Sequence, residues 1–270
     1  SAGRLEEGTV VELSGELPWP GDATGRALDF DKVDTLAPVP SPPSVRDFYA
    51  FEEHVANARK RRGLDMVPEW YDVPAFYFSN PAATVGPEEA VSVPPMTEAL
   101  DFELEVALIV RRDGSDIPAV EAWDYVAGLT IMNDWSARDV QRKEMAIGLG
   151  PAKGKDFATS LGPWLVTLDE LKDKRNGDRH DLRMTARING NQVSEGNTAD
   201  LYWSFPQMIE HASRGTRLRA GDVIGSGTVG SGCILELGPE NVGGWLKPGD
   251  IVELEIERLG ILRNRGGGLG

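Results

Sequence analysis

The stretch Asp101-Phe-Glu-Leu-Glu-Val-Ala-Leu-Ile-Val110 carries the strongest structural signal in this sequence of 270 residues. Read as a strand, it places Glu103 and Glu105 on one face, because successive side chains point to opposite sides. The apolar continuation is typical of a central strand that is buried on both faces. Two carboxylates at the buried end of such a strand repel each other, so they need raised pKa values, a basic partner or a cation. A hard divalent ion suits them best, since Mg²⁺, Mn²⁺ and Ca²⁺ prefer oxygen ligands.

The Glu-x-Glu spacing is weak evidence by itself. It recurs at Glu253 and Glu255, where an exposed strand face explains it fully. A second segment, residues 128–141, strengthens the case because it reads as a buried strand that ends at Asp134 and turns into a helix. Ser136 and Asp139 also fit a capping box there, and spacing alone favours a capping role for Asp134.

The remaining pattern predicts a β-rich α+β fold. The sequence contains 31 glycines and 18 prolines, which indicates many turns. We expect strands at 9–13, 103–110, 164–166, 184–188 and 251–256, and helices at 44–61, 120–126, 136–143 and 205–213. A proline-rich segment at 37–43 marks a boundary. We therefore expect a small N-terminal β-rich subdomain with its linker at 1–40, a main domain at 41–264 and a disordered, glycine-rich tail at 265–270.

Composition argues against several classes of partner. The formal net charge of −15 repels phosphate backbones and anionic membranes, so we expect neither nucleic acid nor membrane binding. The single cysteine, Cys233, has no partner for an intramolecular disulfide. No stretch reaches the ~20 apolar residues of a membrane span. We expect a soluble, cytoplasmic protein.

Several motifs together resemble the fumarylacetoacetate hydrolase family. They are Arg46-Asp-Phe-Tyr-Ala-Phe-Glu-Glu-His54, Glu103-Leu-Glu105, Asn133-Asp-Trp-Ser-Ala-Arg-Asp-Val-Gln141, Gly154-Lys-Asp-Phe157 and a closing segment at 225–237. They occur in the family's order, from about residue 42 to 255. The resemblance implies a mixed β-sandwich or roll for the main domain, and a homodimer.

The resemblance also implies a metal-dependent active site. The metal ligands would be Asp47, Glu103, Glu105 and Asp134, with Mg²⁺ as the expected ion and Mn²⁺ or Ca²⁺ as alternatives. The catalytic residues would be His54, Glu236, Lys155 and Gln141, and the substrate-binding residues Arg138, Tyr49, Tyr77 and Thr228. If residues 44–61 form one helix, His54 lies two turns after Asp47 on the same face.

The implied reaction is hydrolysis of a carbon–carbon bond in a β-diketo acid of the fumarylacetoacetate or acylpyruvate type, as in the catabolism of aromatic compounds. His54 would activate water, Glu236 would orient the imidazole, and the metal would stabilise the enolate leaving group. The alternative within the superfamily is a decarboxylase or isomerase of the oxaloacetate or 2-hydroxyhepta-2,4-diene-1,7-dioate type. A water-activating base is superfluous in a decarboxylation, which favours the hydrolase. A non-catalytic protein with a structural Ca²⁺ is the third hypothesis.

Overall fold

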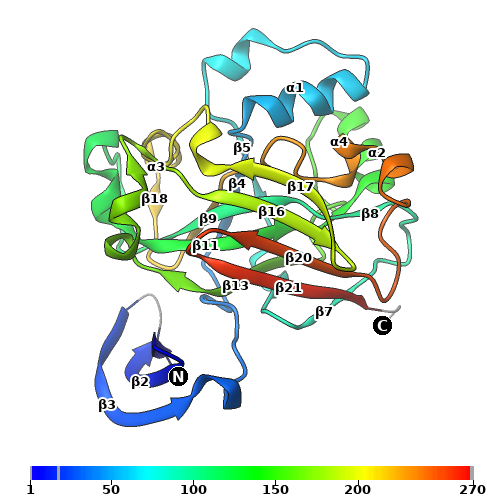
Figure 1. Ribbon diagram of the computed structural model, residues 1–270. Coiled ribbons are helices and arrows are strands. Elements are labelled where there is room, and N and C mark those ends of the chain that lie inside the picture. The colour runs from blue at the N-terminus through cyan, green and yellow to red at the C-terminus, as the bar shows by residue number, and fades with distance from the viewer. Residues whose placement is uncertain (1, 17–18, 268–270) are drawn as a thin grey trace.

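The computed structural model describes residues 2–16 and 19–267, and a seven-stranded mixed sheet forms the centre of its main body (Figure 1). The strand order is β5-β4-β19-β9-β11-β13-β6. These strands are β4 (Val45–Phe48), β5 (Phe76–Ser79), β6 (Thr84–Val85), β9 (Leu104–Val110), β11 (Val126–Asp134), β13 (Thr159–Val166) and β19 (Val223–Gly225). β9 pairs antiparallel with both β11 and β19, and all its residues are buried. The predicted central strand is therefore confirmed.

A second sheet of five strands packs against the first. Its order is β17-β16-β20-β21-β7. Its strands are β7 (Ala90–Ser92), β16 (Arg183–Ile188), β17 (Asn191–Asn197), β20 (Ile251–Ile256) and β21 (Gly260–Gly267). Along β20 every second side chain is buried, which places Val252, Leu254 and Ile256 in one core with Val106 and Leu108 of β9. The predicted β-rich α+β fold is thus confirmed, with two sheets enclosing the main core.

Short helices and two-stranded ribbons surround the sheets. The α-helices are α1 (Glu52–Arg61), α2 (Arg138–Ile147), α3 (Phe205–Ser213) and α4 (Ile234–Leu237). The ribbons pair β8 (Leu100–Asp101) with β12 (Ser136–Ala137), β10 (Gly114–Ser115) with β18 (Arg217–Leu218), and β14 (Arg175–Asn176) with β15 (Arg179–His180). α3 has the predicted bounds, and a capping box between Ser204 and Gln207 begins it. None of the helices in the described part of the chain has the length and hydropathy of a membrane span.

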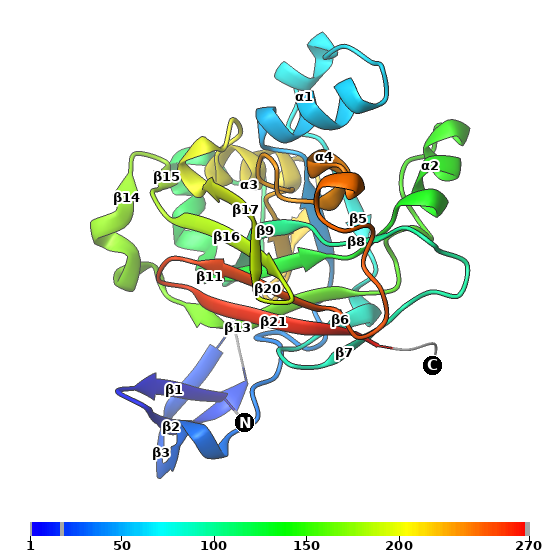
Figure 2. The ribbon, with the colours of Figure 1, turned by 45° about the vertical axis from the view of Figure 1, so that its right-hand side comes forward.

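The N-terminal residues form a small separate sheet, as predicted. Its antiparallel strands are β1 (Ala2–Glu6), β2 (Thr9–Glu16) and β3 (Trp19–Asp29). Figure 2 shows this sheet set apart below the main body. The rings of Phe30 and Trp164 make an edge contact between the two parts, with centroids 5.8 Å apart.

The prediction of one helix over residues 44–61 is wrong. Residues 45–48 form β4, which pairs in parallel with β19 and antiparallel with β5, and only residues 52–61 form α1. All four residues of β4 are buried, so pairing inside the sheet outweighs local helical periodicity there. α1 has acidic residues in its first turn and basic residues in its last, which suits the helix dipole.

Three other local predictions need correction. The 120–126 segment is a 3-10 helix, Ala119–Tyr125, instead of an α-helix. α2 begins after Ala137 without a side-chain cap, because the Ser136 hydroxyl donates to the Asp134 carbonyl and Asp139 accepts from Thr97. The predicted disordered tail at 265–270 is wrong for residues 265–267, since these belong to β21 and pair with β7. Its last residues, 268–270, lie outside the described part.

A substitution in the central strand tests this account of the core. Leu108→Ala removes a fully buried side chain, and we expect the free energy of unfolding to fall by about 2–5 kcal/mol in a denaturant titration. Leu149→Ala is the matched control, because Leu149 is 89% exposed and its loss should change stability by less than about 0.5 kcal/mol. Equal effects of the two substitutions would contradict the assignment of β9 to the core.

Candidate active site

Four carboxylates that lie on or directly before β4, β9 and β11 of the central sheet meet in one buried cluster, with β19 between β4 and β9. Asp47, Glu103, Glu105 and Asp134 each contribute an oxygen, and these oxygens all lie within 4.8 Å of one another. The sheet topology brings them together. Glu105 pairs with Met132 across β9 and β11, and Asp47 pairs with Gly225 across β4 and β19. We call this group the carboxylate cluster.

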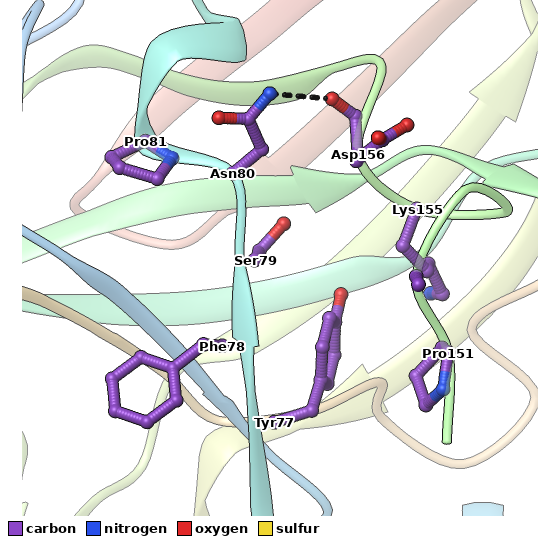
Figure 3. Close-up of a pocket in the computed structure, with 9 residues that line it drawn as sticks. Tyr77, Phe78, Ser79, Asn80, Pro81, Pro151, Lys155 and Asp156 are labelled. Carbon is purple, nitrogen blue, oxygen red and sulfur yellow. Dashed lines mark hydrogen bonds between the residues drawn. The ribbon is translucent and has the colours of Figure 1, made fainter. Parts of the chain in front are cut away.

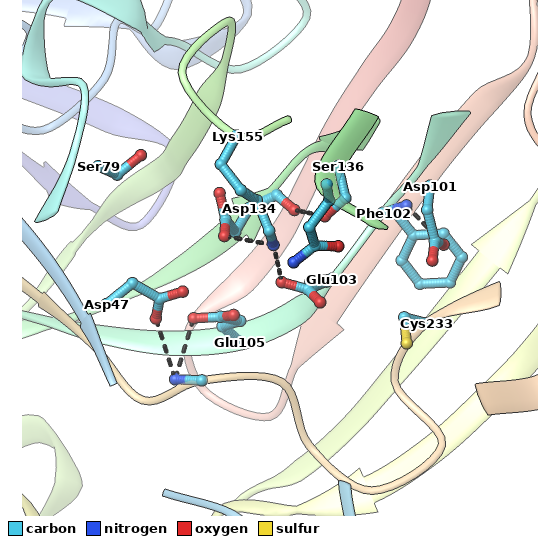
Figure 4. Close-up of polar contacts among 12 residues, drawn as sticks. Asp47, Ser79, Asp101, Phe102, Glu103, Glu105, Asp134, Ser136, Lys155 and Cys233 are labelled. Carbon is cyan, nitrogen blue, oxygen red and sulfur yellow. Dashed lines mark hydrogen bonds and ion pairs between the residues drawn. The ribbon is translucent and has the colours of Figure 1, made fainter. Parts of the chain in front are cut away.

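The loop after β19 approaches the carboxylate cluster closely. The backbone N–H of Gly227 donates to Asp47 Oδ1 at 3.2 Å and to Glu105 Oε2 at 3.1 Å (Figure 4). A Cβ atom at Gly225 would lie 2.7 Å from Asp47 Oδ1 and 2.4 Å from the Met132 methyl group. Glycine is therefore needed at position 225 so that the strand can pass beside the two carboxylates.

Buried cations compensate only part of the negative charge. Lys155 Nζ contacts Glu103 and lies 2.6 Å from Asp134 Oδ2, and Arg138 Nη2 donates to Glu103 Oε1 at 2.7 Å. Burial acts to raise the pKa of Glu103, but these two cations hold it well below its usual value. Burial, followed by repulsion from a neighbouring carboxylate, raises the pKa of Asp47 and of Glu105 well above the ordinary range. Asp47 and Glu105 therefore hold protons more readily than ordinary carboxyls, and a bound cation would have to displace those protons.

The donor set of the cluster fits a divalent cation. Glu105 Oε1 and Asp134 Oδ1 are buried and have no hydrogen-bond partner in the described part of the chain. Buried polar atoms without partners are costly, and carboxylate oxygens are the ligands that Mg²⁺, Mn²⁺ and Ca²⁺ prefer. Four ionised carboxylates and one divalent ion together carry a net charge of −2. The positive charges of Lys155 and Arg138 offset it. All four predicted ligands therefore lie where one ion could contact them.

A cavity of about 350 Å³ adjoins the cluster. Figure 3 shows Tyr77 and Lys155 at its border, with Phe78, Ser79 and Asn80 along one wall. The Tyr77 hydroxyl donates to Asp134, and Lys155 reaches the same carboxylate. The size is at the lower end of the range for small-molecule sites. Tyr77 and Lys155 are thus the residues that connect the cavity to the cluster, whereas the four carboxylates and His54 do not line it.

Gly154 allows the lysine loop to lie against α2. A Cβ atom at Gly154 would come within 2.8 Å of the Gln141 backbone nitrogen. Gln141 lies on the first turns of α2, and its side-chain oxygen accepts from Arg138 Nη1 at 3.0 Å. The close approach of this loop to the helix therefore brings Lys155 and Gln141 to the same side of the cluster.

His54 and Glu236 form a hydrogen-bonded dyad between α1 and α4. His54 Nδ1 lies 2.5 Å from Glu236 Oε1, and both side chains are buried. Glu236 Oε2 accepts from Asn57 Nδ2 at 3.1 Å and from the Ser231 backbone N–H at 2.9 Å. Because Glu236 engages Nδ1, Nε2 is the ring nitrogen left for proton transfer. Hydrogen bonds of Asp101 join α4, which carries Glu236, to Arg138 and so to Glu103, which places the dyad near the cluster.

The structure places Asp47 and His54 on different elements, unlike the single helix that the sequence predicted. Asp47 and His54 do not share a helix, because Asp47 lies on β4 and His54 on α1. The Tyr49 ring packs edge-on against the His54 ring at 5.3 Å, and burial raises the pKa of Tyr49 to about 12. Thr228 is buried in the loop after β19.

Arg138 is engaged by the protein itself. Its Nε donates to Asp101 at 2.7 Å, its Nη2 to Glu103 and its Nη1 to Gln141. This arrangement supports Glu103 and leaves little of the guanidinium for the predicted grip on a substrate carboxylate. Sequence analysis missed Asp101 and Asn57. Their proximity in sequence to Glu103 and His54, two and three residues away, was the only available signal.

The raised pKa of Glu105 gives a test in metal-free buffer. A carboxyl whose folded-state pKa is raised contributes stability below its unfolded pKa, about 4.3, and that contribution is lost as the pH rises through the folded-state pKa. We therefore expect Glu105→Gln to make the metal-free chain more stable than wild type at pH 7–8 and to weaken this pH dependence, with the part due to Asp47 remaining, as measured by thermal unfolding.

The same substitution should lower Mg²⁺ or Mn²⁺ affinity by more than the roughly 10–100-fold cost of losing an outer-shell partner. Calorimetric titration measures this. Glu255→Gln is the matched control, since Glu255 has the same motif spacing but pairs with Arg187 at the surface. Normal metal binding by the Glu105 variant would rule out the carboxylate cluster as the metal site.

Comparison with known proteins identifies the family. The family model for the fumarylacetoacetate (FAA) hydrolase C-terminal domain matches residues 44–265. A mitochondrial oxaloacetate tautomerase from Homo sapiens is 34% identical, covering 88% of this chain and 71% of that protein. A fumarylacetoacetase from Arabidopsis thaliana is 32% identical, covering 77% of this chain and 61% of that protein.

A solved structure supports the same relationship. The crystal structure of a 2-hydroxyhepta-2,4-diene-1,7-dioate isomerase from Mycobacterium marinum aligns with a TM-score of 0.75 and 26% identity, covering 97% of this chain and 88% of that one. The sheet order and the buried carboxylate cluster thus occur in a chain whose main domain matches the family over nearly its whole length. The chain belongs to the fumarylacetoacetate hydrolase family.

Proposed function

We propose that this enzyme is a divalent-metal-dependent tautomerase or isomerase, which moves a proton on a small 2-oxo acid through an enolate. The observation that carries the proposal is the His54–Glu236 dyad beside the carboxylate cluster. A tautomerase must remove a proton from carbon, so it needs such a base as much as a hydrolase does. The dyad therefore does not favour hydrolysis, contrary to the sequence argument. The human relative is named as a tautomerase and the mycobacterial one as an isomerase, and both names support the proposed reaction over hydrolysis.

The proposed proton transfer uses the chain's own residues. A divalent cation bound by Asp47, Glu103, Glu105 and Asp134 would act as a Lewis acid that polarises the 2-oxo group. His54 Nε2 removes the proton from the carbon next to that group, and the electron pair of the C–H bond becomes the enolate. His54 then returns the proton to the enolate oxygen, which gives the enol. Glu236 orients the imidazole and stabilises its charged form.

Lys155 contributes a fixed positive charge next to the reacting atoms. Burial acts to lower the pKa of Lys155, but Asp134 and Glu103 raise it above its usual value, so the ammonium stays charged. A preformed cation in a buried site stabilises negative charge as it develops on the substrate. We assign Lys155 this role, with Tyr77 and Gln141 as further hydrogen-bonding groups nearby.

The substrate class follows from the charge of the site and from a relative. Lys155 and a bound divalent cation would attract an anionic oxo acid. Oxaloacetate, a 2-oxo dicarboxylate, is the substrate in the human relative's name. Mg²⁺ is the proposed ion because the ligands are all hard oxygens. The homodimer and the cytoplasmic location stay predictions from the family resemblance and the composition.

Carbon–carbon hydrolysis is the second candidate function. One relative is named fumarylacetoacetase, and the same dyad would activate water for attack on a diketo acid. The two functions differ in their products. Tautomerisation changes only the enol absorbance, whereas hydrolysis of an acylpyruvate releases pyruvate. Assays of the wild-type enzyme with oxaloacetate enol and with acylpyruvates, with and without Mg²⁺, separate them.

Substitution of His54 tests the catalytic assignment. We expect His54→Asn to lower kcat by about a hundredfold or more, because the general base is lost, and to leave Mn²⁺ binding unchanged in a calorimetric titration. His211→Asn is the matched control, since His211 lies on α3 and packs against Phe76 outside the cluster. Turnover of the His54 variant at the wild-type rate would remove His54 from the mechanism.

A further inference from the structure

Asp101 is a buried carboxylate outside the carboxylate cluster. It accepts hydrogen bonds from four N–H groups. It ends β8, just before Glu103, and is fully buried. Its Oδ1 accepts from the backbone N–H groups of Phe102 at 2.9 Å and Ile234 at 2.7 Å. Its Oδ2 accepts from Arg138 Nε at 2.7 Å and from the Leu235 N–H at 3.0 Å. Figure 4 shows Asp101 to one side of the cluster, close to Phe102 and Cys233.

The first connection from Asp101 leads to a predicted metal ligand. Asp101 holds one edge of the Arg138 guanidinium, and the same guanidinium donates through Nη2 to Glu103 Oε1 at 2.7 Å. The other oxygen of Glu103 contacts Lys155. The planar guanidinium has a fixed geometry, so the Asp101 contact determines how Arg138 presents Nη2 to Glu103.

The second connection leads to the catalytic dyad. The Ile234 and Leu235 N–H groups, which donate hydrogen bonds to Asp101, belong to the first turn of α4. Glu236 follows them directly. A helix of four residues has little stability of its own, so its place depends on such tertiary contacts. Asp101 thereby anchors the backbone that carries Glu236 to His54.

We propose that Asp101 is a positioning residue that couples the two halves of the active site, by holding Arg138 against Glu103 and α4 under the His54–Glu236 dyad. Asp101 is not a member of the carboxylate cluster. Its effect on turnover rests on the proposed function, whereas its effect on metal affinity and on α4 does not.

Asp101→Asn is the decisive variant. Both carboxylate oxygens accept from N–H groups, so whichever way the amide is turned, its NH₂ group faces two donors. We expect Mn²⁺ affinity to fall about 10–100-fold, as for loss of other outer-shell partners. We also expect faster amide hydrogen exchange at residues 234–237, and a kcat at least tenfold lower with KM changed by less than threefold.

Asp222→Asn is the matched control. Asp222 is also a buried carboxylate paired with arginine, accepting from Arg46 Nη1 at 3.1 Å, Ser44 Oγ at 2.7 Å and the Arg219 N–H at 2.7 Å. Among the described residues, its side chain forms no hydrogen bond or ion pair with α4 or Arg138. We expect its variant to lose thermal stability but to keep wild-type Mn²⁺ affinity and wild-type exchange at 234–237. Each protein is measured well below its own melting temperature.

Arg138→Lys tests the connection to Glu103 without changing the connection to α4. It also replaces the Asp101 variant as the test if that variant does not fold. Lysine keeps the charge but lacks the fork that joins Asp101 to Glu103, so Mn²⁺ affinity should fall while exchange at 234–237 stays as in wild type. The proposal is overturned if the Arg138 variant binds Mn²⁺ normally, or if the Asp101 variant matches the Asp222 variant in affinity and exchange. A wild-type enzyme inactive on oxo acids would refute the proposed function and leave these two measurements decisive for Asp101.

Discussion

Mutual repulsion of four buried carboxylates is the constraint on which the rest of this structure depends. Asp47, Glu103, Glu105 and Asp134 lie within a few ångströms of one another, and all four are buried. Such an arrangement costs folding free energy unless cations or protons balance it. Lys155 and Arg138 balance Glu103 and Asp134, while Asp47 and Glu105 keep raised pKa values. The site is thus prepared for a divalent ion at the expense of stability without one.

Rigid elements support this site on every side. The four carboxylates lie on or next to β4, β9 and β11 of the central sheet, and the second sheet packs the core behind β9. The dyad lies on α1 and α4, whose relative place is set by Glu236 and by contacts of α4 with β8. Pre-organisation of this kind suits an enzyme that stabilises an enolate, because the charged groups are already in place before the proton moves.

The chemistry of the family explains why the sequence pointed to the site more securely than to the reaction. Hydrolysis, isomerisation and tautomerisation all pass through an enolate that a cation stabilises, so they share the ligands and the base. Glu103, Glu105 and Asp134 belong to motifs with that shared purpose. The difference between the reactions lies in which atom accepts the proton and whether water attacks, and no motif in the sequence encodes either choice.

The sequence by itself determined the central strand, predicted at 103–110 and observed at 104–110, together with helix α3 and the β-rich class, because each follows from local periodicity. The residues of the carboxylate cluster followed from short motifs that resemble the family. Only the tertiary structure decided that residues 45–48 join the sheet, that Glu236 meets His54 and that Arg138 serves Glu103 and Asp101. The physical reason is that these outcomes depend on pairing between segments 35 to 182 residues apart. Local propensity carries no information about such partners.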